Sequence, residues 1–126
     1  MINSNRILIV DDEPDIISVF KIILEENGFR VDSFNDPLTA LSNFRPGSYD
    51  LVILDIKMPQ MDGFELYQEM KKQDIKIKAC FLTASEMYYE KFRKQDYCEL
   101  DKTLFIRKPI ENEELVKEIN KIMRSC

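Results

Sequence analysis

Histidine and tryptophan are both absent from this chain of 126 residues. Without an imidazole, the chain has no histidine for acid–base catalysis, metal binding or phosphohistidine formation. Its three cysteines, Cys80, Cys98 and Cys126, lack the spacing of a metal site and are odd in number. We therefore expect no disulfide, and we interpret Cys80 as a core residue. The chemistry of this chain must use carboxylates, lysine, threonine and the backbone.

Long apolar runs and an excess of positive charge are also missing. Stretches such as Ile7–Val10 and Leu51–Leu54 are far too short to cross a bilayer. No basic segment followed by an apolar run opens the chain, so we expect a cytoplasmic protein without membrane attachment. The 18 basic and 23 acidic residues give a net charge of −5, which disfavours direct binding to nucleic acid. The length predicts a single domain over residues 1–126.

What the chain does contain is a strict alternation of apolar runs and stretches of helical period. The predicted strands are Arg6–Val10, Phe29–Phe34, Asp50–Leu54, Lys78–Leu82 and Thr103–Ile106. The predicted helices begin at Pro14, after the cap signal Asp36-Pro37, at Phe64, at Glu86 and at Glu111. Buried strands that alternate with helices predict a parallel sheet with helices on both faces. Ligands of such sheets bind beyond the carboxyl ends of the strands.

Polar residues follow four of the predicted strands. They are Asp11-Asp12-Glu13, Asp55, Thr83-Ala84-Ser85 and Lys108-Pro109. Because the carboxyl ends of parallel strands meet at one edge, we expect carboxylates, a hydroxyl and an ammonium to gather there. Crowded carboxylates repel one another unless a cation lies among them, and hard oxygen ligands suit Mg²⁺. The sequence therefore predicts a magnesium site.

Such a site also suits a phosphoryl group. Mg²⁺ and Lys108 would balance the charge of the phosphoryl oxygens, and Thr83 would donate a hydrogen bond to one of them. The central carboxylate, Asp55, is then a candidate nucleophile that forms an aspartyl phosphate.

Five segments of the chain together resemble a known family. They are Val10-Asp-Asp-Glu-Pro14, Asp50-Leu-Val-Ile-Leu-Asp55, Met58-Pro-Gln-Met-Asp-Gly63, Leu82-Thr-Ala84 and Lys108-Pro109. In this order and spacing they resemble the receiver domains of response regulators in two-component signalling, over nearly the whole chain. The resemblance implies an α/β fold of the flavodoxin-like type, a three-layer sandwich of five βα units. Its parallel five-stranded sheet would have the order 2-1-3-4-5.

The resemblance also implies roles for the acidic residues. Asp55 would be the phosphoacceptor and a metal ligand. Asp12 would bind Mg²⁺ directly, Asp11 would act mainly through water, and the backbone carbonyl of Lys57 would complete the protein's share of the ligands. Lys57 and Ser85 match positions that tune the lifetime of the acyl phosphate.

Further roles concern the response to phosphorylation. The resemblance implies that Lys108 pairs with the phosphoryl group and that its bond to Pro109 is cis. Thr83 would move toward the phosphoryl group while Phe105 turns inward, although Phe105 also fits an ordinary core position. These shifts would remodel the surface formed by the fourth helix, fifth strand and fifth helix.

Partners follow from the same resemblance. We expect a sensor histidine kinase or a histidine phosphotransfer protein as the donor, and a downstream effector or an attached output domain as the recipient of the signal. Homodimers could form through the switch surface. The chain would catalyse only its own phosphorylation and slow dephosphorylation, so we expect a switch and not an enzyme in the usual sense.

Two features of the chain differ from the usual pattern of this family. The family usually has a Gly-Ala turn where this chain has Tyr97–Lys102, and an aromatic residue is common at the position of Ile110. Both departures fall on the predicted signalling surface. We interpret Asp62-Gly63 as a turn, with Gly63 free to take a positive φ.

Three alternatives use related folds. A hydrolase of the haloacid-dehalogenase type needs a second Asp two residues after the nucleophile, where this chain has Lys57. A flavoprotein needs a loop rich in Ser, Thr and Gly after the first strand, where this chain has Asp-Asp-Glu. An adaptor that works without phosphorylation is disfavoured by the complete acidic pocket, but the sequence leaves it open.

Overall fold

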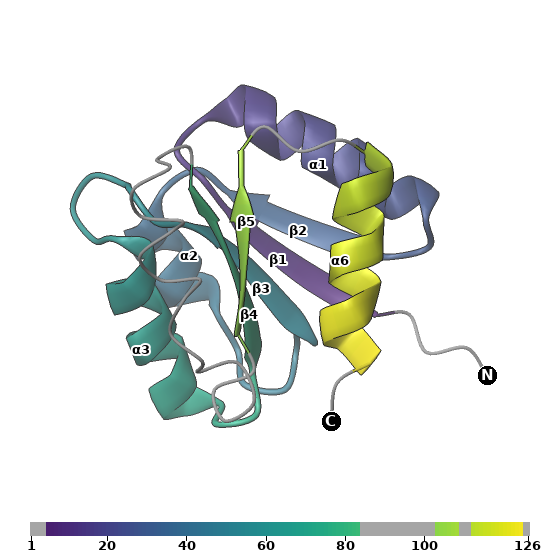
Figure 1. Cartoon of the computed structure of the whole chain (residues 1–126). Helices are drawn as coiled ribbons and strands as arrows, with labels where there is room; N and C mark the ends of the chain where they lie inside the picture. The colour runs from purple at the N-terminus through teal and green to yellow at the C-terminus, as the bar shows by residue number, and fades with distance from the viewer. Residues whose placement is uncertain (1–4, 84–102, 109–111, 125–126) are drawn as a thin grey trace.

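A computed structural model describes residues 5–83, 103–108 and 112–124, with the backbone alone for residues 103–107, 112 and 124. From the first strand to the fourth, strands and helices alternate along the chain, as the sequence predicts (Figure 1). The strands are β1 (Arg6–Val10), β2 (Arg30–Phe34), β3 (Leu51–Asp55), β4 (Lys78–Thr83) and β5 (Thr103–Arg107). The described helices are α1 (Pro14–Glu26), α2 (Pro37–Asn43), α3 (Gly63–Gln73) and α6 (Asn112–Arg124).

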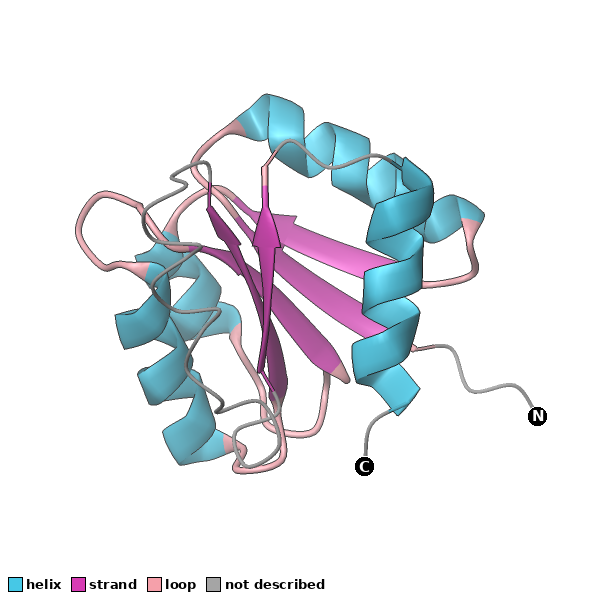
Figure 2. Ribbon diagram, in the orientation of Figure 1, coloured by secondary structure: helices cyan, strands magenta, loops and turns pink. Residues whose placement is uncertain are grey.

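The strands form one five-stranded sheet in the order β2-β1-β3-β4-β5, so the predicted order is confirmed. Every neighbouring pair is parallel, with Ile9 opposite Ile53 and Ile53 opposite Cys80 in the register. The carboxyl ends of the strands therefore meet at one edge, where the arrowheads gather in Figure 2. The chain leaves β1 toward β2 on one side and later returns to β3 on the other. The strand order thus reverses beside β1, and ligands of such sheets bind at this point.

Two apolar layers hold the helices against the sheet. On one face, Ile9 and Ile53 pack with Leu24 of α1 and Leu115 of α6. On the other face, alternate strand residues such as Leu54 pack with helices α2 and α3. Figure 1 shows α1 and α6 on one side of the sheet and α2 and α3 on the other. With both faces covered, β3 is buried along its whole length, which explains the uninterrupted apolar run Leu51–Leu54.

Local signals in the sequence set the helix ends. Pro14 is the first residue of α1, and Gly28 takes the positive φ of +93° that ends this helix. Asp36 caps α2, because its side chain accepts a hydrogen bond of 2.8 Å from the backbone N–H of Thr39. The predicted helix starts at Pro14 and at Asp36-Pro37 are confirmed.

The prediction of a positive φ at Gly63 is wrong. Gly63 is the first residue of α3, and Asp62 caps the helix in a capping box with Glu65. The positive φ of this loop lies at Gln60, with φ of 73°. A glycine is needed at position 63 for another reason: a Cβ there would lie 2.4 Å from the backbone oxygen of Asp55. Gly63 therefore permits a close approach of two backbones.

Other expectations differ from the structure by a residue or lie outside the described part. β3, β4 and β5 each extend one residue beyond the predicted end, so that Asp55 and Thr83 belong to their strands. The predicted fourth helix from Glu86 and the unusual segment Tyr97–Lys102 fall outside the described residues. Within the described part, the helices are too short or too polar to cross a membrane.

Candidate functional site

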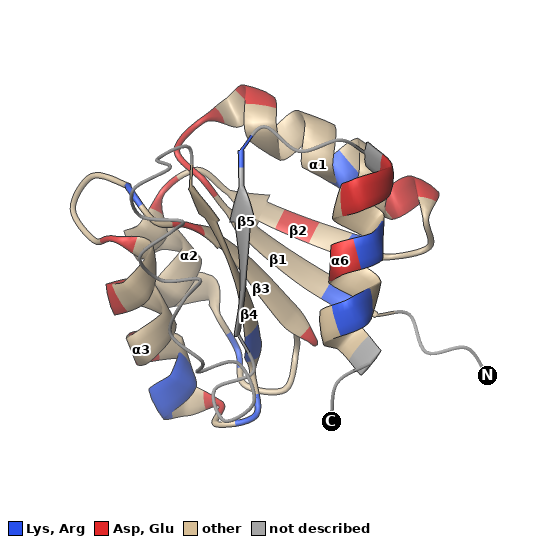
Figure 3. Cartoon of the chain, in the orientation of Figure 1, with Lys and Arg blue, Asp and Glu red and all other residues tan. Residues whose placement is uncertain are grey.

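Four strand ends bring the predicted residues to one edge of the sheet. Asp11 follows β1 and is fully buried, while its neighbour Asp12 is exposed. Asp55 and Thr83 are the last residues of β3 and β4 and retain 5% and 2% exposure. Lys108 directly follows β5 and is also buried. Figure 3 shows the acidic segments after β1 and β3 and the basic position after β5 at this same edge.

The Lys108 ammonium is surrounded by three carboxylates. Its Nζ lies 2.9 Å from Asp11 Oδ2, 2.8 Å from Glu13 Oε1 and 3.5 Å from Asp55 Oδ1. It donates a hydrogen bond to Glu13. Asp11 Oδ2 lies at ion-pair distance but receives no hydrogen bond. An ammonium carries three donors, so the three carboxylates at these distances compete for the same group.

The crowding of charges shifts the pKa values at the site. Burial, followed by the charge of Asp11, raises the pKa of Asp55 to about 7. Burial also raises the pKa of Asp11, and the neighbouring ammonium offsets this only in part. For Lys108, burial would lower the pKa, but the hydrogen bond to Glu13 and the contact with Asp11 raise it overall. Lys108 is therefore charged at neutral pH, whereas the carboxylates disfavour one another's charge.

The acidic residues fit a divalent cation. Asp11, Asp12, Glu13 and Asp55 each place a carboxylate oxygen within 4.8 Å of the others. The buried Asp11 Oδ2 has the Lys108 ammonium at ion-pair distance but accepts no hydrogen bond, so it can accept one from a water ligand of a cation. Carboxylate oxygens with an open side toward solvent suit Mg²⁺, which keeps several waters. The donor set therefore agrees with the predicted metal.

Backbone hydrogen bonds hold the strand ends in place. The N–H of Lys108 donates to the carbonyl of Thr83 at 2.7 Å, which extends the β4–β5 ladder by one bond. The N–H of Ile56 donates to Leu82, and the N–H of Gly63 donates to Ile56, both at 2.9 Å. The residue after Asp55 is thus tied to β4 and to the start of α3.

For the other predicted site residues, the structure describes only part of the surroundings or none. Lys57 lies in the loop after β3 with an exposed side chain. Phe105 lies in the middle of β5, opposite Phe81 in the register, and its side chain is outside the described part. Ser85 and Pro109 fall outside the described residues, so the cis bond at Pro109 stays a prediction.

Glu13 is the residue of this site to which the sequence argument assigned no role. It lies 95 positions from Lys108 in the chain, and yet its Oε1 is the carboxylate oxygen closest to the ammonium and accepts a hydrogen bond from it. The available signal was its position directly after Asp11 and Asp12, at the same strand end.

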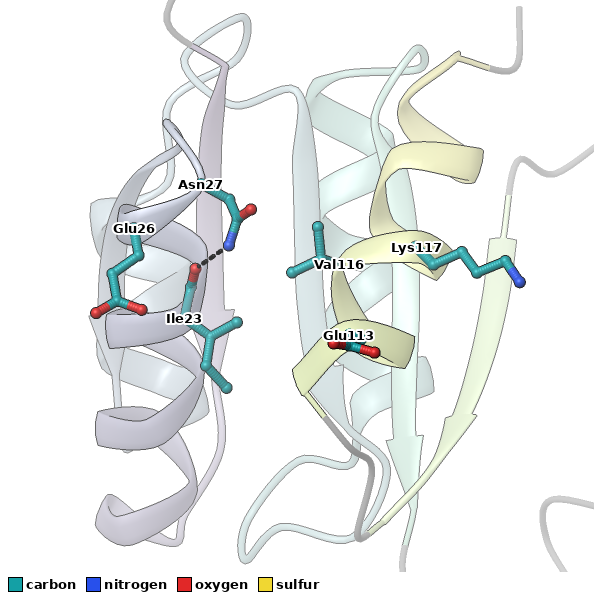
Figure 4. Close-up of a pocket in the computed structure, with 6 residues that line it drawn as sticks. All are labelled: Ile23, Glu26, Asn27, Glu113, Val116 and Lys117. Atoms are coloured by element: carbon teal, nitrogen blue, oxygen red, sulfur yellow. Dashed lines mark hydrogen bonds between the residues drawn. The ribbon is translucent and has the colours of Figure 1, made fainter.

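A separate open cavity of about 360 Å³ lies between α1 and α6 (Figure 4). It is lined by Ile23, Glu26, Asn27, Glu113, Val116 and Lys117. The side-chain amide of Asn27 donates to the carbonyl of Ile23 at 2.8 Å on its α1 wall. Among the described residues, the group able to hold a metal ion lies at the strand ends and not in this cavity. The strand-end cluster is therefore the candidate site.

Comparison with known proteins agrees with the geometry. The profile of the family described as "Response regulator receiver domain" matches residues 7–120, which is most of the chain. The chain belongs to the response regulator receiver family. The receiver is the signalling switch of a two-component system and has the phosphoacceptor role there, and the adaptor alternative is not favoured. The match also gives no support to the hydrolase or flavoprotein alternatives.

Individual receivers show the same similarity. The response regulator SaeR of Staphylococcus aureus (strain USA300) is 32% identical over 121 residues, which cover 94% of this chain and 50% of that protein. The chain thus spans about half the length of the curated relatives that it matches. The structure of the response regulator TrrA of Thermotoga maritima in complex with Mg²⁺ and BeF superposes with a TM-score of 0.78 at 36% identity, covering 94% of this chain and 98% of that one. The non-phosphorylated HemR receiver domain of Leptospira biflexa also has a TM-score of 0.78, at 27% identity and with 96% and 95% coverage.

Proposed function

We propose that Asp55 accepts a phosphoryl group and that this modification switches the receiver. The observation that carries the proposal is the position of the Asp55 carboxylate. It ends the central strand β3, lies 3.5 Å from the Lys108 ammonium and shares a 4.8 Å cluster with Asp11 and Asp12. A nucleophile, a cation and metal-binding carboxylates thus meet at one point.

The reaction is a transfer of one phosphoryl group. A carboxylate oxygen of Asp55 forms a new P–O bond while the P–N bond to the donor's imidazole breaks. The imidazole nitrogen leaves with the electron pair and takes a proton from solvent. Lys108 balances charge on the phosphoryl oxygens through its ammonium. Later attack by water on phosphorus regenerates the Asp55 carboxylate and releases phosphate, so the activity is limited to the domain's own modification.

Mg²⁺ is the cofactor that we propose for this chain. Asp12 and Asp55 would hold it directly, Asp11 through water, and Lys57 through its backbone carbonyl. When bound, the ion supplies positive charge that offsets the phosphoryl oxygens and the carboxylates. The carboxylate cluster and the Asp11 Oδ2 oxygen, which accepts no hydrogen bond, support this assignment.

Signalling would then proceed from the phosphoryl group to the surface. Thr83, buried at the end of β4, would donate a hydrogen bond to a phosphoryl oxygen, and Phe105 would turn inward in response. Lys57 and Ser85 would set the lifetime of the acyl phosphate. The surface around β5 and the neighbouring helices would carry the signal, either to an effector or through a homodimer.

The whole protein is proposed to work in the cytoplasm as part of a two-component pathway. A histidine kinase or histidine phosphotransfer protein would donate the phosphoryl group, and an effector or output domain would receive the signal. Residues 1–126 form a single receiver domain in this proposal, without direct contact to nucleic acid or membrane. The net charge of −5 supports the last point.

The test is the intact mass of the protein after incubation with a small acyl-phosphate donor, with and without Mg²⁺. We expect the wild type to gain one phosphoryl group in the presence of Mg²⁺ and Asp55→Asn to gain none. Asp62→Asn is the matched control, because it removes a nearby carboxylate outside the cluster while asparagine still caps α3. A phosphoryl gain by folded Asp55→Asn would contradict the proposal. The absence of any gain by the folded wild type would also contradict it and would favour the adaptor that works without phosphorylation.

A further inference from the structure

The three carboxylates around Lys108 differ in how firmly the protein holds them. The Asp11 side chain is fully buried, and its Oδ1 accepts a hydrogen bond of 2.9 Å from the backbone N–H of Glu13. The Asp55 side chain is 7% exposed at the end of β3. The Glu13 side chain is 58% exposed, although its Oε1 lies closest to the ammonium. Glu13 is thus the carboxylate that can return to water most easily.

Phosphorylation of Asp55 would create a new demand on the same ammonium. The arriving phosphoryl oxygens carry about two negative charges and require a hydrogen-bond donor. The Lys108 ammonium already lies within 3.5 Å of three carboxylates and donates a hydrogen bond to Glu13, so an arriving phosphoryl oxygen must displace one of these contacts. Losing Asp11 would leave a buried charge without its cation, which is strongly unfavourable. Losing Glu13 transfers a half-exposed carboxylate to solvent, which costs little.

We propose that Glu13 is a placeholder for the phosphoryl group: it holds the Lys108 ammonium before phosphorylation and yields this hydrogen bond to a phosphoryl oxygen. The inference rests on the proposed phosphorylation of Asp55 and assigns a positioning residue to that reaction. Glu13 holds the Lys108 ammonium beside the carboxylate cluster, but it also competes with the incoming group for the same hydrogen-bond donor.

In the described part of the chain, the Glu13 side chain has no role in capping α1 that would hide this one. It precedes α1 as the capping residue, but its side chain makes no capping hydrogen bond. Replacing it by alanine therefore leaves the helix start unchanged. Its loss removes one negative charge from the carboxylate cluster and frees one donor of Lys108.

The lost charge and the freed donor have opposite effects on Mg²⁺ binding and on the rate of phosphorylation. With one carboxylate fewer and with Lys108 free to approach Asp55, the cluster attracts Mg²⁺ less strongly. At saturating Mg²⁺, however, the freed donor is available to the phosphoryl group, so the reaction of Asp55 becomes faster. A general distortion of the site would instead weaken Mg²⁺ binding and slow the phosphorylation of Asp55.

The experiment compares the wild type, Glu13→Ala and Glu13→Gln with the control Asp15→Ala. Asp15 is an exposed carboxylate in the first turn of α1 that makes no ion pair with Lys108 in the described structure. The dissociation constant of Mg²⁺ is measured by titration calorimetry without a phosphoryl donor. The rate of phosphoryl mass gain from a small acyl-phosphate donor is measured at saturating Mg²⁺. Urea midpoints confirm that each variant is folded.

For Glu13→Ala we expect Mg²⁺ binding to weaken by about two- to fivefold and the phosphoryl rate to rise by about two- to fivefold, factors that correspond to a half-exposed ion pair. Glu13→Gln should shift both in the same directions by less, and Asp15→Ala should leave both near the wild type. A phosphoryl rate that falls or stays constant in folded Glu13→Ala overturns the placeholder role while the proposed function stands. If the folded wild type gains no phosphoryl group, the proposed function fails and this inference fails with it.

Discussion

Replacing Gly63 by alanine tests the close approach between α3 and the end of β3. A Cβ at position 63 would lie 2.4 Å from the backbone oxygen of Asp55 and 3.1 Å from Cα of Ile56. The first distance is about 1 Å shorter than the 3.4 Å at which ordinary contacts begin. Both obstacles are backbone atoms, which cannot rotate away as a flexible side chain would. The start of α3 must therefore move relative to β3.

The size of the effect follows from the contact. Overpacking of a rigid site costs about 1–3 kcal/mol, and a backbone obstacle places Gly63→Ala at the upper end. Alanine also restricts the unfolded chain, which returns about 0.4–1 kcal/mol. The net loss in unfolding free energy is then about 2 kcal/mol, or a drop of about 8 °C in Tm for a domain of this size. A movement of about 1 Å beside a reacting group is also expected to slow the reaction of Asp55 by about 10–100-fold.

Urea unfolding followed by circular dichroism measures the stability, and phosphoryl mass gain measures the reaction. The control is Gly47→Ala, because Gly47 has a φ of +80° but open space around its missing Cβ. For alanine at position 47, the strain of this φ alone costs about 1–2 kcal/mol, and the restriction of the unfolded chain offsets part of that cost. Gly47 also lies before β3, at the edge of the sheet opposite to the site. Gly47→Ala should therefore lose less stability and keep the wild-type reaction rate. If Gly63→Ala is as stable as Gly47→Ala and reacts as fast as the wild type, the close-approach argument is wrong.

Three further predictions concern stability and reactivity. Burial and a hydrogen bond to a carboxylate raise the pKa of Tyr49 to about 12, above the value of about 10 in an unfolded chain. The unfolded chain loses this proton first, so the unfolding free energy of the wild type should fall as pH rises from about 10 to about 12. Urea titrations of Tyr49→Phe should lack this part of the pH dependence. If the unfolding free energies of both proteins fall equally with pH, the assignment to Tyr49 is wrong. Asp62→Ala removes the capping box of α3 and should lower the unfolding free energy by about 1 kcal/mol, whereas Asp62→Asn should keep most of it. Burial raises the pKa of the Cys80 thiol and shields it from reagents. In a Cys98→Ser, Cys126→Ser variant, where Cys80 is the remaining thiol, a thiol reagent should therefore react only after denaturation. Labelling of the native variant would show that Cys80 is accessible.

The fold was predictable because its signals are local. Uninterrupted apolar runs such as Leu51–Leu54 require cover on both faces, and only a parallel sheet between two helix layers provides it. The rule that strand ends meet at one edge then brought Asp11, Asp55 and Lys108 together from distant parts of the chain. The predicted strand ends were one residue short at Asp55 and Thr83, because a polar side chain suggests a loop even where the backbone ladder continues.

What could not be predicted depends on distances between elements. The contact of Glu13 with Lys108 requires the directions of two long side chains from different elements. The role of Gly63 depends on how closely α3 approaches β3, whereas the Asp-Gly pair by itself suggests a turn with positive φ. Asp32 of β2 accepts hydrogen bonds from Tyr49 at 2.6 Å and from Arg6, the first residue of β1, at 3.1 Å. This network likewise leaves no pattern in the sequence.

The hydrogen bond from the N–H of Lys108 to the carbonyl of Thr83 bears on how this chain can vary during evolution. It fastens the residues after β5 to the end of β4, independently of the sequence that connects the two strands. Insertions or substitutions in that connection, such as the unusual Tyr97–Lys102, can therefore accumulate without separating the hydroxyl of Thr83 from the ammonium of Lys108. The connection between β4 and β5 can therefore differ in length and sequence while the strand-end residues keep their positions.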